Sequence, residues 1–293
     1  MYLNHFGLRE FPFGLTPDTG FAYRGQQCQA ALNTVLLSLQ GGDGFIKVTG
    51  EVGTGKTLMC RMLLEKLSPG TVSAYLPNPK LHPHEMLRSL AQDLGLRVVR
   101  LRAENDLYHA VERKLLALAG EGRRVVLCVD EAQELPLDTL ESLRLLSNLE
   151  TGKQKLIQIV LFGQPEFNAM LKRPALRSLA SRVGFSARLG PLGRADCHAY
   201  LRHRLGVAGW SGPDVFTNAA ARLLWRASAG VPRRVNTLAH KALLLAYGRG
   251  VHRVDAFTLW HAWRDEQSLF GALNSLFINS MQALCGRFAQ GAR

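Results

Sequence analysis

Short hydrophobic runs alternate with amphipathic stretches through the first two thirds of the chain. Residues 125–129 are five consecutive apolar residues, which is typical of a strand covered on both faces. Similar short runs and stretches of helical spacing follow one another on either side of it. This alternation predicts βαβ units, in which helices cover a parallel sheet. The expected strands are residues 44–50, 71–76, 125–129, 156–162 and 183–189.

The pattern changes near Pro191, after which we find only helical spacing. Asp214 and Asp255 are placed to act as N-cap residues, and Pro232 suits a first helical turn. The expected helices are residues 194–205, 214–229, 232–248 and 255–267. We therefore predict a three-layer αβα domain with a parallel sheet over residues 1–190, followed by a small all-α domain over residues 191–268.

A last segment, residues 269–293, places its apolar side chains on one helical stripe. Its opposite face is neutral rather than rich in Lys and Arg, which argues against binding to an anionic membrane surface. Polar residues interrupt the segment, so we do not expect it to span a bilayer. We favour packing onto the all-α domain or docking to a partner protein.

The composition describes a soluble globular protein, with 47% hydrophobic and 20% charged residues among 293. Its five cysteines are scattered singly, which argues against a disulfide framework and against a cysteine-based zinc site. The first twelve residues already contain charged side chains, so we expect no signal peptide.

Positive charge is concentrated in the second half of the chain. Residues 1–150 contain 16 Lys and Arg against 17 Asp and Glu, whereas residues 151–293 contain 20 against 6. A basic half suits a polyanionic partner such as nucleotide phosphate or nucleic acid, although a solvated basic surface would have the same composition.

The strongest chemical signal lies between the first expected strand and the helix that follows it. The sequence GEVGTGKT fits the pattern G-x-x-x-x-G-K-[ST], with a third glycine inside it. Glycines allow left-handed turns that direct successive backbone N–H groups inward, and the helix N-terminus attracts anions. The pattern predicts that the lysine contacts the β- and γ-phosphates of a nucleotide and that the threonine hydroxyl contacts Mg²⁺. The predicted binding residues are Gly50, Glu51, Val52, Gly53, Thr54, Gly55, Lys56, Thr57 and the following Leu58.

Two acidic residues follow the third expected strand. Asp130 lies at its carboxyl end, where parallel sheets place their ligands, and we predict that it orients Mg²⁺. Glu131 is predicted to polarise the attacking water as a general base. An acidic helix start would be an alternative explanation for Glu131. Gln164 ends the next strand, where its amide either senses the γ-phosphate and water or is only a polar turn residue before Pro165.

These motifs together resemble the AAA+ ATPases of the ExeA/GspA type, which serve type II secretion and type IV pilus assembly. The resemblance covers residues 1 to about 250 and rests on MYLNHFGLREFPFGLTP, FIKVTGEVGTGKT, VVLCVDEAQ, AYLPNP, GVPRRVN and HKALLLAYG. It implies a P-loop NTPase domain with a helical lid and ATP as the nucleotide. Unlike the longer secretion homologues, this chain has no clear transmembrane helix and no room for a periplasmic peptidoglycan-binding domain, and this departure favours a cytoplasmic protein, with a peripheral place at the bacterial inner membrane as a further expectation. The pilus branch of the family, which serves mannose-sensitive haemagglutinin pili, is the most similar.

The resemblance also implies roles for three arginines. Arg233 matches the lid arginine that reaches the γ-phosphate, with an ordinary surface ion pair as the alternative. Arg177 and Arg182 lie where the family has its arginine finger, which acts on the site of a neighbouring subunit in a ring. Ala180 occupies the place of a further arginine of the family pattern, so the choice between the two stays open, with Arg182 slightly favoured.

We therefore expect a Mg²⁺-dependent ATPase that forms homo-oligomers and works on pilus or secretion assembly proteins. One alternative is a DNA-binding AAA+ ATPase of the transposition type, which the basic half would suit. Another is a nucleotide-gated scaffold with little turnover, against which the Asp130–Glu131 pair argues.

Overall fold

The computed structural model describes residues 2–77, 80–99, 103–152 and 154–269, and they form two compact units. The α/β unit comprises residues 15–196 together with Val231–Arg233. The helical unit comprises the described residues of 1–14 and 197–230 and those from 234 onward. The predicted C-terminal segment lies, beyond Leu269, outside the described residues.

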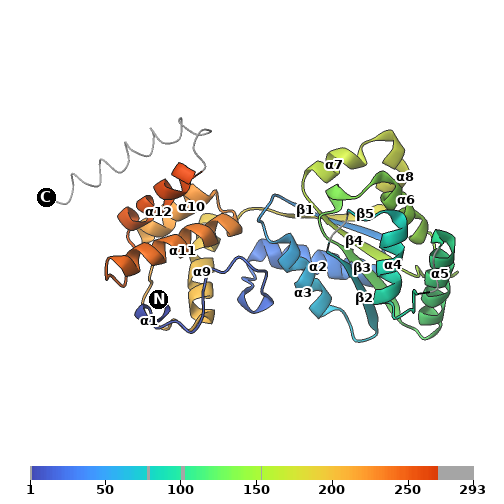
Figure 1. Ribbon diagram of the computed structural model, residues 1–293, viewed down its shortest axis with the longest axis horizontal. Helices are drawn as coiled ribbons and strands as arrows, with labels where there is room; N and C mark the ends of the chain where they lie inside the picture. The colour runs from blue at the N-terminus through green and yellow to red at the C-terminus, as the bar shows by residue number, and fades with distance from the viewer. Residues whose placement is uncertain (1, 78–79, 100–102, 153, 270–293) are drawn as a thin grey trace. The chain divides into compact units, whose positions relative to one another are not determined.

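A five-stranded parallel sheet is the centre of the α/β unit (Figure 1). Its strand order is β2-β3-β4-β1-β5. Strand β1 precedes the predicted phosphate loop, β3 precedes the predicted acidic pair, and the two strands lie on either side of β4. The predicted α/β fold class with a parallel sheet is confirmed, and each expected strand is found. The strands are β1 Phe45–Gly50, β2 Thr71–Leu76, β3 Arg124–Val129, β4 Gln158–Gly163 and β5 Val183–Leu189.

Alternate residues of the strands face two separate hydrophobic cores. Val125, Leu127 and Val129 of β3 belong to one core, whereas Val126 and Cys128 belong to the other. This period of two explains why β3 must be apolar throughout. Helices α2 (Gln26–Gly41) and α3 (Lys56–Lys66) cover the second face, and the later helices of the α/β unit, within residues 83–180, cover the first.

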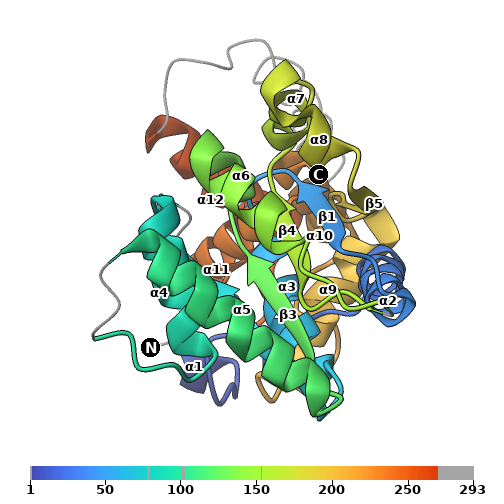
Figure 2. The ribbon, with the colours of Figure 1, turned by 90° about the vertical axis from the view of Figure 1, so that its right-hand side faces the viewer.

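The helices of the first face include α4 and α5, which lie side by side (Figure 2). Helix α4 begins with a capping box, in which Glu85 accepts from the backbone N–H of His82 at 3.2 Å. The His-Pro-His-Glu sequence at residues 82–85 thus forms the start of this helix. The helices are α4 Pro83–Asp93, α5 Glu104–Gly120, α6 Leu137–Leu146, α7 Glu166–Leu171 and α8 Arg177–Ala180, with short 3₁₀ turns η1 Thr19–Phe21, η2 Ala132–Glu134 and η3 Pro174–Leu176.

The described residues of the second unit are mainly helical, and the N-terminal segment packs with them. The phenol of Tyr2 lies 2.9 Å from Nδ1 of His240, and the Arg204 guanidinium donates to the carbonyls of Pro12 and Gly14. Residues 1–14 are therefore part of this unit, although the sequence-based division places them in the α/β domain. The helices are α1 Tyr2–His5, α9 Arg194–Val207, α10 Asn218–Ser228, α11 Pro232–Gly248 and α12 Ala256–Leu269.

The predicted N-caps of the helical unit are found at one position and not at the other. Oδ1 of Asp255 accepts from the backbone N–H of Thr258 at 2.8 Å, as expected of an N-cap. Asp214 is not an N-cap, because α10 begins later and is capped by Thr217, whose hydroxyl accepts from Ala220 N at 3.1 Å. In the described part of the chain, no helix has the length and hydropathy needed to cross a membrane.

Candidate functional site

The loop between β1 and α3 has the backbone that the glycine pattern predicts. Gly53 and Gly55 have φ values of 81° and 99°, a region that residues with a Cβ rarely adopt. A Cβ on Gly53 would also lie 2.7 Å from Cβ of Arg233, so the close approach of these segments requires glycine there. The loop is therefore built by a backbone that other residues could not adopt without strain.

The N-terminus of α3 is left without a side-chain cap. Its N-cap residue is Gly55, and no side chain of the described residues accepts from the first turn there. The free N–H groups and the helix dipole make this terminus suitable for an anion. Thr54 is buried and its hydroxyl donates to the Glu51 carbonyl at 2.8 Å, which holds the loop in shape.

Lys56 places a buried positive charge at this loop. Its side chain is only 5% exposed, and Nζ donates to the carbonyls of Gly50 at 2.9 Å and Glu51 at 3.2 Å. Burial lowers the pKa of Lys56, and the nearby Glu131 and Asp130 oppose that shift. The ammonium thus sits in a site where added negative charge, such as phosphate oxygens, would be stabilising.

Asp130 and Thr57 meet at the carboxyl edge of the sheet. The Thr57 hydroxyl donates to Oδ2 of Asp130 at 2.6 Å, and the backbone N–H of Glu131 donates to Oδ1 at 3.0 Å. Asp130 is 3% exposed, and this burial raises its pKa, although both hydrogen bonds act in the opposite direction. A hydroxyl and a carboxylate in contact form a hard oxygen donor pair, which is the chemistry that Mg²⁺ prefers.

Glu131 adopts a strained backbone beside this pair. Its φ of 50° and ψ of 43° are left-handed, which is uncommon for a residue other than glycine and is found preferentially at functional positions. Oε2 of Glu131 accepts from Nε2 of Gln133 at 2.6 Å and from Nε2 of Gln164 at 3.1 Å. Burial alone would raise the pKa of Glu131, but these two bonds and the charge of Lys56 outweigh it and lower the pKa.

Gln164 is therefore brought to the predicted site, whereas Gln133 was missed by the sequence analysis. Gln133 lies in η2, and its Oε1 accepts from the backbone N–H of Gln164 at 2.9 Å. The only signal in the sequence was its place two residues after Glu131. A glutamine at that place cannot be told from an ordinary polar turn residue, because no periodic pattern marks it.

The remaining predicted loop residues have distinct environments. Val52 is 55% exposed, whereas Leu58 on α3 packs against the core between α2, α3 and the sheet. Leu58 can therefore contribute only its backbone to a ligand at the loop. Glu51 is exposed at the start of the loop.

The three predicted arginines are placed differently. The backbone N–H of Arg233 donates to the Gly53 carbonyl at 3.2 Å, so the start of α11 contacts the phosphate loop within the α/β unit. Arg177 begins α8, and Arg182 precedes β5; both are exposed. Among the described residues, no hydrogen bond or ion pair joins either side chain of this second pair to Asp130 or Glu131.

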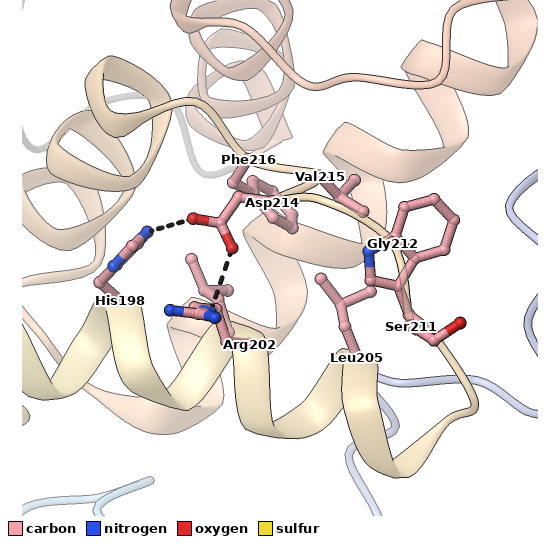
Figure 3. Close-up of a pocket in the computed structure, with 10 residues that line it drawn as sticks. His198, Arg202, Leu205, Ser211, Gly212, Asp214, Val215 and Phe216 are labelled. Atoms are coloured by element: carbon pink, nitrogen blue, oxygen red, sulfur yellow. Dashed lines mark ion pairs between the residues drawn. The ribbon is translucent and has the colours of Figure 1, made fainter.

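A concave site of about 230 Å³ lies in the helical unit. Asp214 is one of its lining residues, and its Oδ1 lies 3.1 Å from Arg202 Nε and its Oδ2 lies 3.5 Å from His198 Nε2 (Figure 3). Leu205, Phe216 and other apolar side chains form the rest of its lining. Among the residues that line this pocket, the Asp214 carboxylate is therefore already engaged by Arg202 and lies near His198.

Comparison with known proteins bears directly on the α/β unit. Residues 39–171 match the model of the AAA domain. This AAA-domain match begins in α2, continues through the phosphate loop and Asp130–Glu131, and ends with α7. The α/β unit thus has the P-loop fold of AAA proteins.

One curated protein to which this chain is similar is general secretion pathway protein A of Aeromonas hydrophila. It is 42% identical over 254 residues, which cover 87% of this chain and 46% of that protein. The chain therefore spans about half the length of this relative.

Solved structures share the fold at low sequence identity. The Aeropyrum pernix ORC2 protein has a TM-score of 0.67 at 16% identity, covering 91% of this chain and 73% of that chain. Cdc6p of Pyrobaculum aerophilum has a TM-score of 0.68 at 15% identity, covering 89% and 74%. RuvB, the Holliday junction branch migration motor of Thermotoga maritima, has a TM-score of 0.56 at 16% identity, covering 82% and 69%.

Proposed function

We propose that the chain is an ATPase of the AAA+ class that binds ATP at residues 50–58 and hydrolyses it with Glu131. The observation that carries this proposal is the 2.6 Å contact between Thr57, at the start of the phosphate-loop helix, and Asp130, at the end of β3. Two segments 73 residues apart in sequence thereby bring together a carboxylate and a hydroxyl that is next in sequence to Lys56. Phosphoryl transfer to water needs this combination of positioning and charge.

The proposed ligand-binding groups differ in charge and in the part of the nucleotide that each would contact. Backbone N–H groups of the loop and the uncapped end of α3 would bind phosphate oxygens, and Lys56 would neutralise the β- and γ-phosphates. Mg²⁺ fits the Thr57–Asp130 oxygen pair, would be held by these two residues and would supply additional positive charge to the triphosphate. Gln164 and Arg233 would contact the γ-phosphate or the water beside it.

Glu131 is the proposed general base. Its carboxylate is ionised at neutral pH, as a proton acceptor must be, because its pKa lies below the ordinary value for glutamate. Both amide bonds fall on Oε2, and among the described residues neither amide bonds to Oε1, which is the oxygen that we assign to the water. The base is thus held by one oxygen and acts with the other.

Hydrolysis by the wild type compared with Glu131→Gln tests the proposal. Loss of the base should lower kcat by about 10²–10⁴-fold, while ATP binding measured by calorimetry stays within a few-fold. Equal turnover in both proteins would instead support the nucleotide-gated scaffold. Requirement for Mg²⁺ is checked in the same assay by chelation, which should remove the hydrolysis that the wild type shows.

The biological setting that we propose is assembly of a pilus or secretion system. The match to a general secretion pathway protein and the resemblance to the MshM type of pilus-biogenesis ATPase support it. In this setting the chain would lie in the cytoplasm against the inner membrane and act on assembly proteins there. Co-purification of such components with a Glu131→Gln variant, but not with Lys56→Ala, is the expected result.

We further propose a homo-oligomer, which ATP would favour, with Arg182 or Arg177 acting on the neighbouring subunit. Both arginines are exposed, as residues that act on a neighbouring subunit must be. An arginine supplied in this way contributes on the order of 10³-fold or more to phosphoryl transfer. Adding an excess of Glu131→Gln protein to Arg182→Ala protein should restore turnover if Arg182 acts in trans, and Lys172→Ala is the matched exposed control.

A DNA-binding ATPase is the second candidate. Six exposed basic side chains between residues 172 and 194 favour it, because no acidic residue lies among them. They are Lys172, Arg173, Arg177, Arg182, Arg188 and Arg194. One fold neighbour, the Aeropyrum pernix ORC1 protein, was solved in complex with DNA. DNA affinity that falls steeply with salt would support this candidate, and no binding at low salt would remove it.

A further inference from the structure

The polar side chain of Gln133 joins two strand ends at the site. Its Nε2 donates to Oε2 of Glu131 at 2.6 Å, and its Oε1 accepts from the backbone N–H of Gln164 at 2.9 Å. The first contact is after β3, and the second is after β4. A single amide therefore spans the interval between the acidic residue and the neighbouring strand.

The orientation of this amide is determined by its partners. A flipped amide would place its oxygen against the Glu131 carboxylate and its NH₂ against the Gln164 N–H, so both contacts would become repulsive. A Cβ added at Gly163 would lie 3.4 Å from the Gln133 oxygen, which shows how closely β4 approaches this group. The amide is thus held at both ends.

Glu131 needs such support because its own backbone is strained. A left-handed φ of 50° leaves the side chain dependent on surrounding contacts for its direction. Gln133 provides the shorter of the two bonds to its carboxylate. Gln164 provides the other, and its backbone is fixed by the same Gln133 amide.

We infer that Gln133 is a positioning residue for hydrolysis, which holds the Glu131 carboxylate and ties it to the Gln164 end of β4. It acts through Glu131 and does not itself contact the reacting atoms. This inference rests on the proposed function, since it assigns Glu131 its orientation as the base.

Steady-state kinetics of Gln133→Leu tests it. We expect kcat to fall about tenfold or more, because one charge-assisted bond is lost, while KM for ATP changes by less than about threefold. Gln92→Leu, an exposed glutamine on α4, is the matched control and should behave as the wild type. Gln133→Glu retains an acceptor for the Gln164 N–H but opposes the Glu131 carboxylate, so its kcat should fall further.

A double-mutant cycle with Glu131→Gln separates positioning from general structure. If Gln133 acts through Glu131, Gln133→Leu should not lower the residual rate of the Glu131→Gln protein. Additive losses in the cycle, a wild-type kcat in Gln133→Leu, or a change in KM alone would each overturn the inference. Should Gln133→Leu fail to fold, Gln133→Asn is used in the same cycle.

The proposed function and this inference fail in different ways. A wild type with no more hydrolysis than Glu131→Gln refutes the proposed function and, with it, the positioning role. A wild type that hydrolyses ATP but shows additivity in the cycle refutes only the role of Gln133.

Discussion

Lys56 in the α/β unit and Arg204 in the helical unit are both nearly buried cations, with exposed fractions of 5% and 6%. Both donate to backbone carbonyls, Lys56 to the phosphate loop and Arg204 to Pro12 and Gly14 of the N-terminal segment. They differ in what burial does. Burial lowers the pKa of Lys56, so its charge is held at a cost in stability, whereas Arg204 stays charged in any protein environment.

The difference indicates what each unit is organised to do. The α/β unit holds two desolvated charged groups that a bound ligand would stabilise, because burial shifts the pKa values of both Lys56 and Asp130. In the helical unit, the buried charge of Arg204 binds the N-terminal segment to helix α9. Replacement by methionine, which retains volume but not charge, should therefore have opposite effects at the two positions. It should lower stability at Arg204 and ATP affinity at Lys56.

The largest stability effect is expected for Arg204→Met. Two carbonyls would lose their charged donor, and the stacking of the guanidinium over the Tyr200 ring at 5.8 Å would be lost as well. We expect the free energy of unfolding of the helical unit to fall by about 3 kcal/mol. Tryptophan fluorescence during urea unfolding measures this unit selectively, because all four tryptophans, at positions 210, 225, 260 and 263, belong to it.

Arg202→Met is the control for that prediction. Arg202 is exposed and pairs with Asp214, and exposed ion pairs contribute about 0–1 kcal/mol. An equal loss in the two variants would contradict the structural role that we assign to Arg204. Nucleotide affinity should be unchanged in both.

Lys56→Met should show the opposite behaviour. We expect ATP affinity to fall about 100-fold or more, because the charge-assisted contacts to phosphate are lost. Stability of the nucleotide-free protein should be unchanged or higher, since a desolvated charge is removed. Calorimetric titration of ATP and thermal unfolding without nucleotide measure the two quantities. A large loss of stability would place Lys56 with Arg204 as a structural cation.

The same residue predicts a pH dependence. A lysine whose folded pKa lies below its ordinary value of 10.5 binds fewer protons when folded than when unfolded. Stability contributed by Lys56 should therefore rise as the pH increases between these two values. The difference in unfolding free energy between wild type and Lys56→Met should change in this alkaline window and stay constant at neutral pH. A constant difference throughout would show that burial does not shift this pKa.

The sequence could predict those elements that depend on a local residue pattern. Strand β3 and the phosphate loop follow from a five-residue apolar run and from glycine spacing, and the structure has both. The contact of Thr57 with Asp130 could be expected because parallel strands end at one edge of a sheet. Gln133 could not be predicted, because its role depends on the strained turn at Glu131 and on how closely β4 approaches.

The misplaced features of the helical unit have a related cause. The sequence favours Asp214 as a cap, yet its carboxylate pairs with Arg202 and His198 because the helix begins four residues later than position 214. Residues 1–14 belong with helices almost 200 residues away in sequence. Such long-range pairing is set by packing that no local window contains.

Helix N-termini give the last and smallest contrast between the units. Helix α10 is capped by the Thr217 hydroxyl, whereas α3 begins at Gly55 and has no side-chain cap among the described residues. Thr217→Ala should lower the free energy of unfolding of the helical unit by about 1 kcal/mol, because the Ala220 N–H loses its acceptor. Thr217→Ser keeps the acceptor and should retain most of the stability in the same fluorescence assay.

Gly55→Ser should not provide the corresponding gain in α3. The φ of 99° at Gly55 is unfavourable for serine, and a hydroxyl that did cap the helix would occupy the N–H groups proposed to bind phosphate. We therefore expect this variant to be no more stable than wild type and weaker in ATP binding. A Gly55→Ser protein that is more stable and binds ATP normally would show that the open end of α3 is incidental, and the contrast with α10 would no longer separate a ligand-binding terminus from a structural one.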